Sequence, residues 1–73
     1  MKVDRKKIEL LMAKDCLSTT DVADKAMLTS QTVRRAISGN QIKPKTVGKI
    51  AKALGVDVTE ILLEEGDGEN ERN

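Results

Sequence analysis

One sequence pattern occurs four times in this chain: an apolar residue, a residue that can cap a helix, and a second apolar residue five positions after the first. A Ser, Thr or Asp side chain accepts hydrogen bonds from N–H groups that the first turn of a helix leaves unpaired. The two apolar residues close over this cap as a hydrophobic staple, and Asp21 and Glu60 add the acidic residue of a capping box at two of the starts. The pattern therefore predicts four helix starts. It begins at Val3-Asp4, Leu17-Ser18, Leu28-Thr29 and Val56-Asp57 and ends at Ile8, Val22, Val33 and Ile61.

End signals and helical periodicity set the expected helix boundaries. Gly39-Asn40 ends the third helix with residues that tolerate a left-handed conformation. Pro44 suits the first position of a fourth helix, because that position needs no N–H group, and Gly55 ends this helix. No segment shows the alternation of a strand. The expected helices cover residues 5–14, 19–26, 30–38, 44–54 and 58–64.

Apolar residues at helical spacing define the expected core. Ile8, Leu11 and Ala13 are expected on the inner face of the first helix, and Leu10 and Met12 flank them. The core must be aliphatic, because the chain has no aromatic residue. It must also be small, because 73 residues are near the lower limit for a domain without metals or disulfides. The other expected core residues are Val22, Ala23, Val33, Ile37, Val47, Ile50 and Leu54.

Composition argues against several classes of function. The chain has no histidine and one cysteine, so it lacks the commonest general base and can form neither a zinc site nor a Cys–His dyad. It has no glycine-rich phosphate loop either, so an enzyme is the least supported class, and no cofactor or metal is expected. A lone cysteine closes no internal disulfide, and no apolar run approaches the roughly 18 residues of a membrane span. We therefore expect a cytoplasmic protein.

The net charge of +1 conceals a strong asymmetry along the chain. Residues 1–56 hold 12 Lys and Arg against 5 Asp and Glu, whereas residues 57–73 hold 1 against 7. A basic body favours a polyanionic partner, although a solvated, charged surface on a small domain explains the same counts. No apolar residue follows Gly66, so we expect a folded domain over residues 1–65 and a disordered acidic tail over residues 66–73.

The stretch from Leu17 to Gly39 reads LSTTDVADKAMLTSQTVRRAISG. It predicts two short amphipathic helices joined by residues 27–29, and a three-residue connection is the turn length of a helix-turn-helix. The polar side of the second helix carries residue types that hydrogen-bond base edges and phosphates. These residues are Ser30, Gln31, Arg34 and Arg35.

These pieces, in this order and spacing, resemble the Cro/repressor-type (XRE-like, lambda-repressor-like) helix-turn-helix family of phage and bacterial transcription regulators. The matching segments are LSTTDVADKA, LTSQTVRRAISG, a proline a few residues later, and IAKALGV leading to VTEILL. The resemblance covers Leu17 to Leu63. It implies an all-α fold of five helices and double-stranded DNA as the partner.

The resemblance also implies roles for individual residues. The family usually has a glycine at the positions of Cys16 and Met27. These two differences from the family pattern put the geometry of the turns in question, but they do not involve the contact residues. Base contacts are implied for Ser30, Gln31, Arg34 and Arg35, and phosphate contacts for Thr19, Ser38, Asn40, Lys43 and Lys45. Each of these residues also has an ordinary interpretation as a helix cap or a solvated side chain.

The expected function is that of a sequence-specific regulator, expected to repress, that reads the major groove with its third helix. Because one such domain reads only a few base pairs, we expect a homodimer on a roughly palindromic operator. Val58, Leu62 and Leu63 are candidates for its interface, or they close the core. The alternative is an adaptor or antitoxin-like protein-interaction module on the same fold. No small-molecule ligand is evident.

Overall fold

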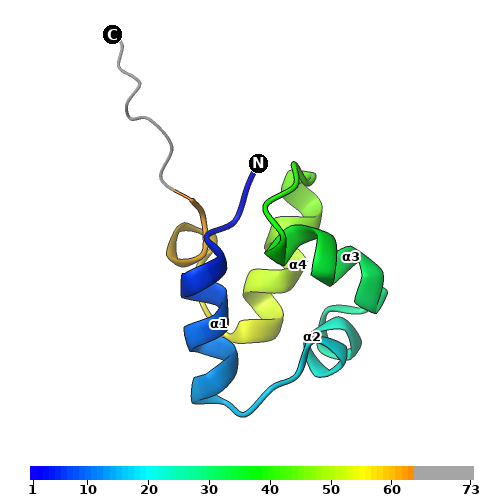
Figure 1. The fold of residues 1–73 in the computed structure, drawn as a ribbon, viewed down its shortest axis with the longest axis vertical. Coiled ribbons are helices and arrows are strands. Elements are labelled where there is room, and N and C mark those ends of the chain that lie inside the picture. Colours follow the sequence, from blue (N-terminus) through cyan, green and yellow to red (C-terminus); the bar gives the residue numbers. More distant parts are fainter. Residues whose placement is uncertain (64–73) are drawn as a thin grey trace, which may run out of the picture.

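The computed structural model describes residues 1–63 of the protein. Figure 1 shows α1 and η1 on one side, α2 and α3 on the other, and α4 between them. None of the helices described is long and apolar enough to cross a membrane. In chain order the elements are α1 (Arg5–Lys14), α2 (Thr19–Ala26), α3 (Ser30–Ile37), α4 (Pro44–Leu54) and the 3-10 helix η1 (Val58–Glu60).

Three of the four predicted starts open α-helices, and the fourth, at Asp57, opens a 3-10 turn. The carboxylate of Asp4 accepts from the backbone N–H groups of Lys6 and Lys7. Ser18 and Asp21 form the reciprocal capping box at α2, with bonds of 3.1 and 2.9 Å. The second apolar residue of each staple is completely buried, so each cap is coupled to the core. These four residues are Ile8, Val22, Val33 and Ile61.

Two of these capping carboxylates are more acidic than usual. The backbone N–H of Ser18, then its hydroxyl and the charge of Lys25, hold the pKa of Asp21 below its ordinary value. The hydroxyl and backbone N–H of Thr59 do the same for the pKa of Asp57. A carboxyl whose pKa is lower in the folded state stabilises the fold when the pH is above its unfolded-state pKa. This stabilisation is lost as the pH falls through the folded-state pKa. Both caps are therefore fully formed at neutral pH.

The last predicted helix is wrong as an α-helix. Instead of a helix over residues 58–64, Val58–Glu60 form a single 3-10 turn. The Asp57 carboxylate accepts from the hydroxyl of Thr59 at 2.6 Å and from its N–H at 3.2 Å, which tightens the turn. The described part of the chain thus has four α-helices, and the residues expected to form the acidic tail lie outside it.

Pairing with the N-terminal segment explains why residues 61–63 do not continue as an α-helix. Val3 and Leu62 form an isolated antiparallel β-bridge. On either side of it, Asp4 N–H donates to Ile61 C=O at 2.7 Å, and Leu63 N–H donates to Lys2 C=O at 3.0 Å. Backbone groups bonded to another segment cannot also form helical bonds. The bridge is a strand-like contact that the sequence analysis did not predict.

The predicted core is largely confirmed. Buried side chains from α1, α2, α3, α4 and residue 61 form one aliphatic cluster. Ile37 is half-buried and packs against this cluster rather than within it. Ala13, expected on the inner face of α1, is exposed, because Leu11 and Met12 turn toward the core instead. The buried residues of the cluster are Val3, Ile8, Val22, Ala23, Val33, Ala36, Val47, Ile50, Ala51, Leu54 and Ile61.

The two positions where the family usually has glycine are both left-handed. Cys16 has φ +55° and Met27 has φ +60°. Met27 ends α2, and the N–H groups that follow reach back to the last turn, with Leu28 N–H donating to Ala23 C=O at 2.8 Å. The left-handed conformation costs a residue with a Cβ atom about 1–2 kcal/mol. The turn of the helix-turn-helix is therefore tight and strained.

Met27→Gly is expected to stabilise the protein. The side chain of Met27 is 87% exposed, so its removal loses little packing. Glycine relieves the left-handed strain, but it also raises the conformational entropy of the unfolded chain, which offsets part of this relief. The free energy of unfolding should therefore rise by about 0.5–1 kcal/mol. Urea and thermal unfolding measure it. Met27→Ala is the control, because it removes the side chain and keeps the Cβ atom; equal stability of the two variants would contradict the strain.

Candidate nucleic-acid interface

Helix α3 presents a polar stripe to solvent. An α-helix turns about 100° per residue, so positions i, i+3, i+4 and i+7 share a face. Four exposed residues stand at these positions, while Val33 and Ala36 on the opposite face are completely buried. The stripe therefore points away from the core. These four residues, named here the α3 stripe, are Gln31, Arg34, Arg35 and Ser38.

Local hydrogen bonds fix both ends of α3. Thr29 caps the start by accepting from the N–H of Thr32 at 3.1 Å. At the other end, Asn40 donates from its side-chain Nδ2 at 3.0 Å and from its backbone N–H at 3.2 Å, both to Arg35 C=O. Asn40 thus terminates α3, as the Gly39-Asn40 pair predicts, and it does so with both its side chain and its backbone. Its phosphate contact stays a prediction.

The structure brings Arg35 together with Lys43. Both line a hollow of about 270 Å³ between α3 and the start of α4, together with the hydroxyl-bearing Thr46. Gln41, at the same hollow, accepts from the amino group of Met1 at 2.9 Å. Two cations beside hydroxyl and amide groups can hold a phosphate and an adjacent base edge. This is the strongest juxtaposition among the predicted contact residues.

Ser38, by contrast, lies beside the first turn of α1. It lines a hollow of about 630 Å³ with Arg5, Lys6 and Leu63. Arg5 already pairs with Glu9 at 3.1 Å, one turn along the same helix. The sequence analysis placed these cations on α1 without assigning them a contact. The only sequence signal was the basic run at residues 5–7, which does not reveal what lies next to it.

Three further predicted contact residues, Lys45, Thr19 and Ser30, do not line the hollow that Arg35 shares with Lys43. Lys45 lines a different hollow, with Lys49 and Lys52, along the outward side of α4. Thr19 is half-buried at the first position of α2, next to the negative charge of Asp21. Ser30 is also half-buried, at the edge of the α3 stripe.

The stretch of chain that contains α3 and α4 carries positive charge without any acidic residue. No Asp or Glu occurs between Asp24 and Asp57. Every Lys and Arg in this interval is exposed, and none forms an ion pair with a described residue. Exposed cations without an ion-pair partner attract a polyanion. They are Lys25, Arg34, Arg35, Lys43, Lys45, Lys49 and Lys52.

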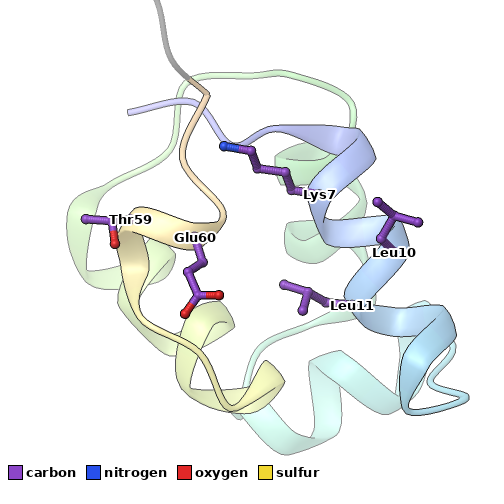
Figure 2. Close-up of a pocket in the computed structure, with 5 residues that line it drawn as sticks. All are labelled: Lys7, Leu10, Leu11, Thr59 and Glu60. Atoms are coloured by element: carbon purple, nitrogen blue, oxygen red, sulfur yellow. The ribbon is translucent and has the colours of Figure 1, made fainter.

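A second surface lies on the opposite side of the molecule. Figure 2 shows a hollow of about 460 Å³ between α1 and η1. Leu11 and Glu60 face each other across it, whereas Leu10 points outward from α1. Leu10 is 63% exposed. No group of three or more potential metal ligands occurs among residues 1–63.

Helices α2 and α3 are each eight residues long and are joined by a three-residue turn, and α3 is polar and cationic on its exposed face. This arrangement defines a helix-turn-helix protein. The comparison with protein families agrees: the family model HTH_3, Helix-turn-helix, matches residues 17–61. The chain therefore belongs to this family, which is the XRE or Cro/repressor type of helix-turn-helix and comprises DNA-binding regulators. No curated protein matches the chain.

Two similar solved structures are native PhpD with cadmium atoms and a mutant of hydroxyethylphosphonate dioxygenase. Each has a TM-score of 0.76 and 23% sequence identity to this chain. The match covers 89% of this chain and only 14% of each of those chains. The chain thus matches a small part of these larger proteins, and the likeness shows the fold alone.

Proposed function

We propose that this protein is a sequence-specific DNA-binding transcription regulator that acts in the cytoplasm as a repressor and not as an enzyme. The observation that carries the proposal is the α3 stripe. Gln31, Arg34 and Arg35 share one exposed face of the second helix of a helix-turn-helix. No acidic residue lies within that helix or near it in the sequence.

The proposed mechanism divides the contacts by their chemistry. Lys43, at the hollow beside Arg35, binds phosphate and sets the depth of α3 in the major groove. Arg35 then hydrogen-bonds O6 and N7 of a guanine, and Gln31 pairs with an adenine. Phosphate contacts contribute affinity and salt dependence, whereas the base contacts contribute sequence preference. Bound at a promoter, the protein would block access of the polymerase.

Two copies are required for a useful site, because a few base pairs do not single out one operator among about a million competitors. We propose a two-fold dimer through the surface of Figure 2. Leu10 protrudes beside the hollow between α1 and η1, so each copy offers a leucine and a hollow on one face, as a two-fold contact needs. Of the earlier candidates, Val58 and Leu62 pack against the core, while Leu63 is exposed.

Leu10→Lys is expected to weaken dimer formation. One leucine and one hollow offer little area against the roughly 800 Å² per partner of a standard interface. We therefore expect a dimer that is weak in solution and that binding to DNA strengthens. Cooperative binding to two half-sites in a gel-shift titration should fall at least fivefold, while binding to one half-site is unchanged. Asp24→Asn on exposed α2 makes a similar change in net charge and is the control. Unchanged cooperativity in Leu10→Lys would place the interface elsewhere.

Selection of bound duplexes from a random DNA pool at near-physiological salt tests the proposed function. A palindrome with half-sites about 10 base pairs apart supports a dimeric, sequence-reading regulator. Binding without enrichment, lost as salt rises, would mean that the protein contacts only the phosphate backbone. No binding at any salt concentration would favour the protein-interaction module instead.

A further inference from the structure

We propose that residues 64–73 bind the cationic surface of α3 in their own chain and compete there with DNA. The cationic surface is defined here as Arg34, Arg35 and Lys43. This inference rests on the proposed function only for the competition, because the contact within the chain is a separate claim. It identifies an occupant of the surface when DNA is absent.

Charge complementarity is the first argument. Residues 64–73 read EEGDGENERN, with five acidic residues and one arginine. The cationic surface belongs to a stretch that has seven Lys and Arg and no Asp or Glu between Asp24 and Asp57. None of the three cations forms an ion pair with a described residue. A carboxylate-rich segment offers this surface the same kind of ligand as a phosphate backbone does.

The second argument is where the described chain ends. Leu63 is anchored by its N–H, which donates to Lys2 C=O at 3.0 Å. It lines the hollow that also contains Ser38 and Gly39, at the carboxyl end of α3. The chain beyond Leu63 therefore starts beside the helix whose cations it would bind.

Reach is sufficient for this contact. The eight residues of α3 span about 12 Å at 1.5 Å per residue. Ten extended residues span up to about 33–36 Å. Even a compact path therefore brings the acidic side chains to Arg35 and Arg34, which lie one turn or less before Ser38. A tethered segment of this length acts at an effective concentration of about a millimolar.

The effect on DNA binding follows from screening. Exposed charges interact over a Debye length of about 10 Å at 0.1 M salt and about 3 Å at 1 M. Neutralising the segment should therefore tighten DNA binding about 3- to 10-fold at 0.05–0.1 M salt. The gain should shrink toward onefold as salt rises. A segment that lies farther from the DNA-binding surface than the Debye length would leave the affinity nearly unchanged.

The test uses a full-length neutral variant in which Glu64, Glu65, Glu69 and Glu71 are changed to Gln and Asp67 to Asn. A second variant ends at Leu63, and thermal unfolding checks that both fold like the parent. The first readout needs no DNA: backbone amide and arginine Nε–H NMR shifts at Arg34 and Arg35 should differ between the parent and both variants. The differences should be independent of protein concentration and should vanish at high salt.

The second readout is the dissociation constant for duplex DNA across a salt series. Tighter binding in both variants together with the shift differences supports the proposal. Tighter binding without shift differences would mean long-range repulsion only, and would overturn the proposed contact. Shift differences in a protein that binds no DNA would retain the contact and reject the proposed function. As a surface control, Lys14→Gln, at the far end of α1, should leave the shift differences intact, whereas Arg34→Gln with Arg35→Gln should abolish them.

Discussion

Replacing Arg35 by alanine is expected to weaken binding to the selected DNA by about 1–3 kcal/mol, or about 5- to 150-fold. The guanidinium is exposed on the α3 stripe and shares a hollow with Lys43. An arginine in the major groove can donate two hydrogen bonds to one guanine, and alanine offers none. The loss should therefore concentrate at one base position of each half-site.

Competition titrations with single-base variants of the operator measure this change, and Lys45→Ala is the comparison. Lys45 lies on the outward side of α4, in a different hollow from Arg35. As a phosphate contact it should weaken all duplexes nearly alike and reduce the salt slope by about one. If Arg35→Ala discriminates between selected and scrambled sites as the parent does, the base-reading role of Arg35 is wrong.

Ile8→Ala is expected to cost about 2–5 kcal/mol of folding free energy. Ile8 is completely buried in α1, where it closes the staple over the cap at Asp4. A core in a domain of this size supplies only about 3–5 kcal/mol of net stability. The variant should therefore be largely unfolded at 37 °C, as monitored by circular dichroism and urea titration.

Leu10→Ala provides the matched control in the same helix. Leu10 is 63% exposed, two residues from Ile8, so its truncation should change the free energy of unfolding by less than about 0.5 kcal/mol. A cost like that of Ile8→Ala would mean that Leu10 is covered in solution. Measurement at several protein concentrations would then show whether a second copy covers it.

The sequence predicted the helix-turn-helix well, because its signals are local. A cap at Ser18 or Thr29 and a staple at Val22 or Val33 act within six residues. The structure confirms each one, and the turn falls at residues 27–29 as expected. The stripe on α3 also follows from sequence, since one buried face of a short helix leaves its polar residues on the other.

Two features could not be predicted in this way. The segment after Asp57 has a cap and apolar residues like those of the other helices, yet its backbone pairs with residues 2–4. The sequence likewise did not show that Ser38 lies beside Arg5 and Lys6. Residues about 30–60 positions apart meet only when the core has assembled, and no local pattern encodes which of them will meet.

By itself, the sequence determined where the α-helices begin and which side chains α3 presents. Short-range hydrogen bonds and helical periodicity decide both before any tertiary contact forms. The tertiary structure decided how residues 58–63 fold and which cations share a hollow: Lys43 lines one with Arg35, and Lys45 lines another with Lys49 and Lys52. The physical reason is that packing of the common core sets the positions of the helices relative to one another, and with them the neighbours of every exposed charge.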